Sequence, residues 1–109
     1  MKDEIREIFT QALFDSIAET QKQSGREVQT MTEDTIPLLD LIGFDSHNGV
    51  EVELHLSVRL GVEVEKLSFR AGKRGSRELK IGEIVTALVN KYGKQFSGTS
   101  TQVEELVSH

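Results

Sequence analysis

The chain has 109 residues, of which 37% are hydrophobic and 28% charged, and its formal net charge is -5. This length and apolar fraction predict one folded domain rather than a disordered chain, and no apolar run approaches the ~20 residues that span a bilayer. The absence of cysteine excludes disulfides, thiolate metal sites and cysteine nucleophiles. The acidic start of the chain is not typical of a signal peptide, so we expect a cytoplasmic protein.

The first segment is predicted to be an amphipathic helix that begins near Asp3 and Glu4 and stops near Ser24-Gly25. Its apolar residues recur at helical spacing. They are Ile5, Ile8, Phe9, Ala12, Leu13 and Ile17. Residues 26–37 are polar and end at Pro37, so they predict a long loop. Loops of this length are uncommon in small domains and often functional.

A short apolar cluster follows Pro37 and runs into Gly43-Phe44-Asp45-Ser46. Glycine permits a tight turn, and either Asp45 or Ser46 can cap the free backbone N–H groups of a helix that starts here. The sequence therefore predicts a turn and a helix start at this point.

Residues 50–64 carry a pattern that fits two structures. Apolar residues alternate with mostly polar ones, which alone favours a strand. The same residues also form two helical stripes on roughly opposite sides, one at Val50, Leu54 and Val58 and the other at Val52, Leu56 and Leu60. Gly61 interrupts the pattern, so a strand reading requires a hairpin around this glycine.

The region from residue 66 to residue 80 is basic in an otherwise acidic chain. Its charges are Lys66, Arg70, Lys73, Arg74, Arg77 and Lys80 against Glu78, or +5. Aromatic side chains for stacking on bases are missing here apart from Phe69, and the acidic remainder repels nucleic acid. We therefore favour a solvated, flexible loop marked by Gly72 and Gly75, and we expect no nucleic-acid partner.

The last predicted helix begins after Leu79 and keeps helical spacing up to Tyr92, with Gly93 at the C-cap position. Residues 94–109 are predicted to be a polar, flexible tail in which 103–107 add a further helical turn. The expected organisation is thus a folded unit over 1–93 and a tail over 94–109, with no second domain.

Few residues suit catalysis or metal binding. His47 and His55 lie among no carboxylate arrangement typical of a metal site, and His109 is terminal, so we expect no metal. Asp45, Ser46 and His47 are adjacent, and neighbours at a helix start point in different directions, so they form no nucleophile–base–orienter chain. We therefore expect no catalytic residue and no enzyme activity.

The run from Gly43 to Leu54 resembles the attachment motif of the acyl carrier protein family, Gly-x-Asp-Ser-Leu followed by a helix with Val-Glu-Leu. This chain reads Gly43-Phe44-Asp45-Ser46-His47, then Val50-Glu51-Val52-Glu53-Leu54. The likeness continues at Val62-Glu63-Val64 and at Ile81-Gly82-Glu83-Ile84, and in helix order it covers roughly residues 5–93. His47 departs from the usual leucine, and the basic 66–80 segment departs from the usual acidic connection.

The resemblance implies an all-α fold, a small bundle of three to four helices with a long loop between the first and second. Residues 47–60 are then the second helix. It also implies that a transferase attaches 4′-phosphopantetheine from coenzyme A to Ser46, with Asp45 assisting a magnesium-dependent transfer. The arm would hold acyl groups as thioesters. A serine at a helix N-terminus suits a phosphodiester, because free N–H groups and the helix dipole favour negative charge.

The resemblance further implies a surface read by partner enzymes, made of His47, Glu51, Glu53 and Glu63, which would act mainly on encounter rate and specificity. Val50 and Leu54 would border a cleft for the acyl chain, while Val52, Leu56 and Leu60 hold the bundle. The expected partners are a phosphopantetheinyl transferase and acyl-transferring or acyl-modifying enzymes of fatty acid or polyketide biosynthesis. We expect a monomer.

Two other interpretations stay open. The chain is then either an unmodified module with the carrier fold that binds a protein partner through its acidic helix and basic loop, or a small regulatory protein in which residues 50–64 form a hairpin.

Overall fold

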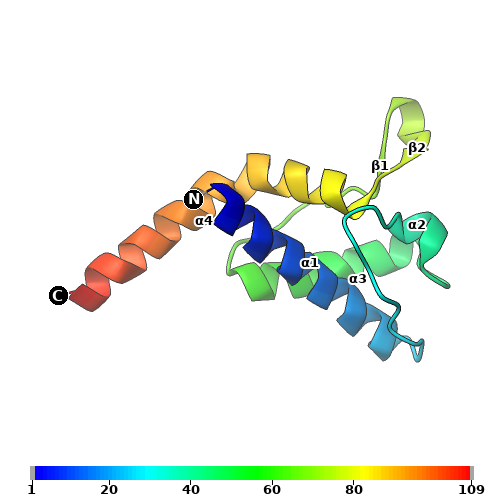
Figure 1. The fold of residues 1–109 in the computed structure, drawn as a ribbon, viewed down its shortest axis with the longest axis horizontal. Coiled ribbons are helices and arrows are strands. Elements are labelled where there is room, and N and C mark those ends of the chain that lie inside the picture. The colour runs from blue at the N-terminus through cyan, green and yellow to red at the C-terminus, as the bar shows by residue number, and fades with distance from the viewer. Residues whose placement is uncertain (1, 109) are drawn as a thin grey trace.

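Three long helices form the body of the molecule in the computed structural model (Figure 1). The structure describes the main chain of residues 2–108 and the side chains of residues 4–45 and 47–95. The helices are α1 (Lys2–Gln23), α2 (Pro37–Asp40), α3 (Ser46–Leu60) and α4 (Ile81–Ser108). Helix α1 packs against both α3 and α4. The predicted small helical bundle is confirmed.

The core forms where the apolar stripes of these three helices meet. Each stripe keeps the i, i+3 or i+4 spacing of one helical face. The buried members are Phe9, Leu13 and Ile17 of α1, Val52, Leu56 and Leu60 of α3, and Ile81, Ile84, Val85, Leu88 and Tyr92 of α4. The prediction for Ile8 was wrong: its side chain is exposed, although the sequence placed it on the buried face.

Helix α1 ends where the sequence predicts. Gly25 has a positive φ of 76°, which an L-residue with a side chain adopts only at a cost. The N–H of Arg26 then donates to the carbonyl of Gln21 over 2.9 Å, so a carbonyl left free by the helix end finds a partner.

The predicted long loop occupies residues 24–36, and its carbonyl groups accept hydrogen bonds from the first N–H groups of α4. The N–H of Ile81 donates to the carbonyl of Thr35 over 2.8 Å, and the N–H of Gly82 donates to that of Glu33 over 2.8 Å. Arg6 of α1 links the loop to the start of α4. Its Nη2 lies 2.6 Å from Glu33 Oε1 and donates to the Gly82 carbonyl over 3.2 Å. The loop therefore closes the bundle and is not a free segment.

Residues 46–60 are one continuous helix, so the hairpin interpretation of residues 50–64 is wrong. Val52, Leu56 and Leu60 are buried as predicted, and the opposite stripe is exposed. Gly61 ends the helix with a φ of 68°, and its N–H donates to the carbonyl of Ser57 over 2.9 Å. The alternating apolar residues of this segment thus form two stripes on opposite sides of a helix. Burial of one face of α3 outweighs the local preference for a strand.

The fold departs from a purely helical one between α3 and α4. Strand β1 (Arg70–Ala71) pairs antiparallel with β2 (Arg77–Glu78), and the short 3-10 helix η1 (Lys73–Gly75) joins them. Gly72 and Gly75 have positive φ values of 85° and 65°, so the glycines that predicted a flexible loop build a tight turn. An ion pair of 2.9 Å between Arg70 and Glu78 links the strands. This hairpin projects from the bundle (Figure 1).

Helix α4 corrects the predicted end at Gly93. It continues through Gly93 to Ser108 and extends beyond the body formed with α1 and α3 (Figure 1). A Cβ at Gly93 would lie 3.3 Å from Val89 Cγ1 and 3.9 Å from Ile5 Cγ2. Gly93 is therefore an interior residue of α4 near Ile5 of α1, and it does not end the helix. The predicted tail over 94–109 stays a prediction, since its side chains beyond residue 95 lie outside the described ones.

Candidate functional site at the start of helix α3

Asp45 is the residue that caps α3. Its Oδ1 accepts hydrogen bonds from the N–H of His47 over 2.9 Å and of Asn48 over 3.2 Å, and Asn48 Oδ1 accepts from the N–H of Asp45 over 3.0 Å. This reciprocal capping box satisfies groups that the helix leaves unpaired. Of the two caps that the sequence allowed, the structure selects Asp45.

Ser46 is consequently the first residue of α3, one position inside the cap. Its main chain is helical, and its side chain lies outside the described residues. The capping box matters for the predicted phosphodiester, because a carboxylate already occupies two N–H groups of this helix end. The anion-binding capacity that we expected there is therefore partly used by Asp45.

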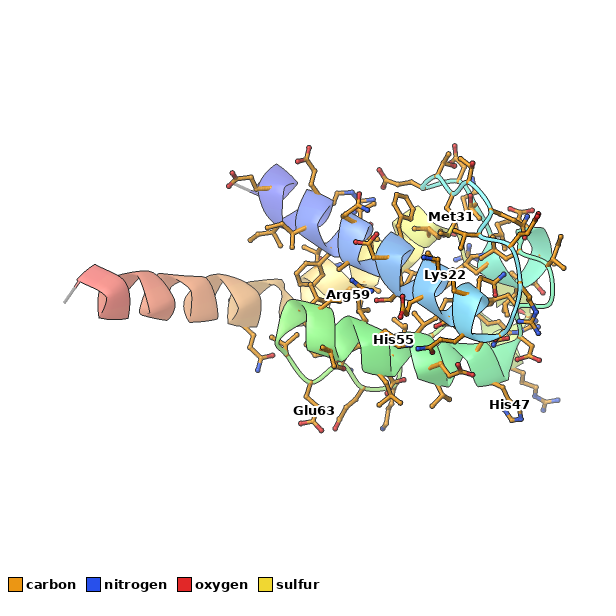
Figure 2. The ribbon with its side chains drawn as sticks, turned by 90° about the horizontal axis from the view of Figure 1, so that it is seen from below. Lys22, Met31, His47, His55, Arg59 and Glu63 are labelled. Atoms are coloured by element: carbon orange, nitrogen blue, oxygen red, sulfur yellow. The ribbon has the colours of Figure 1, made fainter. Side chains whose placement is uncertain are left out.

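The predicted recognition residues are spread along the length of α3 and the turn after it. His47 is exposed at the start of α3 and points away from the bundle, whereas Glu63 is exposed beyond the far end of the helix (Figure 2). A helix of 15 residues is about 22 Å long. Glu51 is half-buried within the first turns of α3, and of these acids it lies nearest in sequence to Ser46.

Glu53 has a structural partner instead of a free surface position. Its Oε2 accepts a hydrogen bond from the N–H of Leu67 over 3.2 Å, which ties α3 to the segment that leads into β1. Its carbonyl also accepts from the hydroxyl of Ser57 over 2.9 Å. Glu53 therefore holds the segment that leads into β1 against α3.

An open groove of about 230 Å³ runs beside the first turns of α3. Its lining comes from α2, α3, the segment before β1 and β1 itself. The residues are Leu38, Gly49, Val50, Glu53, Leu67, Ser68, Phe69 and Arg70. Val50 thus lies where the sequence predicted a cleft residue. Leu54 is not among the lining residues of this groove.

The outer stripe of α3 continues away from this groove. Val50, Leu54 and Val58 are 59%, 66% and 83% exposed. Exposed apolar side chains in a row on one helix are typical of a surface that meets a partner. Leu54 belongs to this outer face.

Phe69 and Gly49 are site residues that the sequence did not single out. A Cβ at Gly49 would lie 3.1 Å from Cε2 of Phe69, and the Phe69 ring packs edge-on against Phe44 with centroids 5.2 Å apart. A glycine inside a helix costs about 1 kcal/mol relative to alanine and often marks a close packing contact, and this was the available signal.

Only some of the basic side chains in the 66–80 segment form ion pairs within the protein. Arg77 Nη1 lies 2.8 Å from Glu83 Oε2, and the N–H of Lys80 donates to Glu83 Oε1 over 3.0 Å. These two contacts, the backbone hydrogen bond first, hold the pKa of Glu83 below its usual value. No ion pair joins Lys66, Lys73 or Arg74 to another residue in the described part of the chain.

His55 has a protein partner. Its Nε2 lies 3.0 Å from Oε1 of Gln23, which links α3 to the end of α1. Among the residues whose side chains are described, no three His, Asp or Glu side chains gather as metal ligands would. Within that same part of the chain, no helix has both the length and the apolar character needed to cross a membrane.

Comparison with known proteins adds no relative: no protein-family model matches the chain, and neither the curated proteins nor the solved structures include a significant match.

Proposed function

We propose that the protein is a non-catalytic acyl carrier that bears a 4′-phosphopantetheine arm on Ser46 and presents thioester-bound acyl groups to partner enzymes. The carrying observation is the position of Ser46 at the first residue of a core helix, directly after a turn held by Gly43. The proposed setting is the cytoplasm, where the partner enzymes of fatty acid or polyketide biosynthesis would meet it.

The neighbourhood of Ser46 fits a slender chain with polar and apolar parts. The groove next to Val50 has apolar walls at Leu38 and Phe69, and Arg70 adds a cation to its lining. This mixture suits an arm that joins a phosphodiester to amide and methylene groups. The acyl group and its pathway do not follow from these residues.

The proposal assigns different tasks to the predicted recognition residues. His47 and Glu51 lie close in sequence to Ser46 and would meet a transferase there, while Leu54 extends the contact along the outer face of α3. Glu63 is too far along the helix to touch a partner centred on Ser46 unless the partner covers the whole of α3.

Intact-mass measurement tests the proposal. Incubation with coenzyme A, Mg²⁺ and a broad-specificity phosphopantetheinyl transferase should add about 340 Da once, the mass of the arm by its chemical formula. Ser46→Ala should block the addition. Ser68→Ala removes a serine from the wall of the groove beside α3 and should leave the addition unchanged. No addition with several transferases, or equal addition to Ser46→Ala, would refute the proposal.

A second candidate function is an unmodified interaction module with the same fold. One observation favours it: the capping box of Asp45 and Asn48 gives the Gly-x-Asp-Ser motif a purely structural use. The outer stripe of α3 would then be the binding face. The mass measurement separates the two functions, because this module gains no arm.

A further inference from the structure

Two glutamine side chains hold the turn that precedes Asp45. The N–H of Ile42 donates to Gln29 Oε1 over 2.7 Å, and Gln21 Nε2 donates to the carbonyl of Ile42 over 3.2 Å. Gln29 Nε2 also donates to the carbonyl of Asp40 over 3.1 Å. We refer to Gln21 and Gln29 as the amide clamp. Both main-chain polar groups of Ile42 are therefore satisfied by side chains from other segments.

The clamp comes from two different parts of the fold. Gln21 belongs to the last turn of α1 and is only 1% exposed, whereas Gln29 belongs to the 24–36 loop. Arg26 completes the support, since its guanidinium lies against Gly43, with Nε 2.5 Å from the place a Cβ would occupy. Three side chains therefore contact the turn just before the helix that starts with Ser46.

The side chain of Ile42, unlike its main chain, has no such support and is exposed to solvent. It is 71% exposed, although Leu41 before it and Phe44 after it are buried. A single exposed apolar residue needs no explanation on its own. What distinguishes Ile42 is an exposed apolar side chain on a main chain held by the clamp. Such an arrangement loses little conformational entropy when a partner covers the side chain, which favours binding.

The charges around Ile42 indicate the chemistry of that partner. Asp40 and Asp45 are exposed on either side of it in the sequence, whereas Arg26, whose guanidinium lies next to Gly43, is half-buried. Each carboxylate binds a backbone N–H group, so both have fixed positions: Asp40 Oδ2 accepts from Ile36 over 2.7 Å, and Asp45 caps α3. A complementary surface has an apolar pocket with lysine or arginine at its rim.

We propose that Ile42 is the apolar anchor with which the protein docks, beside Ser46, into a basic-rimmed pocket of the enzyme that modifies this serine. The inference rests on the proposed function and adds a specificity-determining residue to it. Gln21 and Gln29 act as positioning residues, because they reach the partner only through the orientation that they give to Ile42.

Transferase kinetics test the anchor with one variant and one matched control. Ile42→Ser should lower kcat/KM for modification about tenfold with kcat unchanged, the loss expected when an anchor side chain is removed from an interface. Ile8→Ser removes an exposed apolar side chain of α1 that lies about 20 Å along this helix from Gln21 and outside the proposed binding faces, and it should keep the wild-type value. Both substitutions are on the surface, so both variants should keep the wild-type melting temperature.

Hydrogen exchange tests the clamp without reference to the transferase. Gln29→Leu should remove the protection of the Ile42 amide. In the separate transferase assay, the same variant should lower kcat/KM although its Ile42 side chain is intact. Gln29→Glu keeps the acceptor oxygen and should preserve most of that protection. Gln11→Leu is the control, because the amide of Gln11 donates only to Asp15 one turn along α1.

The possible outcomes separate the failure of the Ile42 anchor from the failure of the proposed carrier function. A wild-type protein that gains no arm rejects the proposed function. A wild-type protein that is modified, with Ile42→Ser modified at the same kcat/KM, rejects the anchor alone. Unchanged protection of the Ile42 amide in Gln29→Leu rejects the clamp.

Discussion

Gly43 is a position where the backbone conformation disfavours a side chain and where the flexible guanidinium of Arg26 must move to admit one. Its φ is 71°, and the guanidinium of Arg26 fills the region next to its Cα. Gly25 has a similar φ of 76° but has open space around it. The two glycines therefore separate the conformational effect of a side chain from its steric effect.

Gly43→Ala should lower the free energy of unfolding by more than Gly25→Ala does. The left-handed conformation costs about 1–2 kcal/mol for an alanine at either position. At Gly43 the displaced Arg26 adds to that loss. Urea unfolding of both variants measures the difference, and Gly43→Ala in an Arg26→Ala background should fall back to the Gly25→Ala value. Equal losses in the two single variants would show that Arg26 does not support the turn.

Glu83 should make stability depend on pH at the acid end. Its hydrogen bonds with the Lys80 N–H and with Arg77 lower its pKa in the folded protein relative to the unfolded chain. A lowered folded pKa means that the stabilisation is present above the usual value of 4.5 and is lost as the pH falls through the lower folded pKa. Glu83→Gln should therefore unfold at lower urea than the wild type at pH 7, and the two midpoints should converge as the pH falls through the lowered pKa of Glu83. A difference between the midpoints that does not shrink as the pH is lowered below 4.5 would contradict this.

Helix α3 is the element that best shows how far the sequence determines the structure. Both of its stripes follow from the spacing of the apolar residues, and Gly61 marks its end. Its helical state does not follow from local pattern, because alternation favours a strand until the buried face finds α1. Tertiary packing decides between the two.

The elements that the sequence missed depend on contacts between distant residues. The hairpin of β1 and β2 is held by the Arg70–Glu78 pair and by the hydrogen bond from the Leu79 N–H to the Phe69 carbonyl. In the candidate site, Asp45, Ser46 and Val50 could be named from the motif. Gln21, Gln29 and Phe69 could not, because no local pattern brings them to the start of α3.

The two stripes of α3 should respond very differently to truncation. Leu56→Ala should lower the free energy of unfolding by about 2–5 kcal/mol, since Leu56 is fully buried and its removal leaves a cavity. Leu54→Ala should change it by no more than about 0.5 kcal/mol, because that side chain is exposed. Chemical denaturation measures both variants. Similar losses would mean that the outer stripe is also covered within the protein.

At the scale of the whole molecule, the proposed function depends on how the fold surrounds Ser46. Helix α3 brings Ser46 to one end of the bundle, the clamp fixes the turn before it, and the segment before β1 forms the wall of the groove. The chain has no cysteine, so a thiol on an arm at Ser46 would be its only one. No internal thiol would then compete for the acyl group.

Electrostatics at this scale should govern how fast a basic transferase finds the protein. Raising the ionic strength from about 0.01 M to 0.5 M should lower kcat/KM for modification about tenfold with little change in kcat, because salt screens the attraction between separated charges. Glu51→Gln should flatten this dependence, since Glu51 is the predicted recognition acid nearest to Ser46 in sequence. A rate that does not respond to salt would argue against an acidic recognition surface.

The central claim is that Ser46 receives the arm, and mapping the modified residue tests it most directly. Trypsin releases residues 27–59 as one peptide, which contains Ser46 together with Ser57 and three threonines. After incubation with transferase and coenzyme A, fragmentation of this peptide should locate an addition of about 340 Da on Ser46 alone. An unmodified peptide, or an addition on Ser57 or a threonine, would contradict the account.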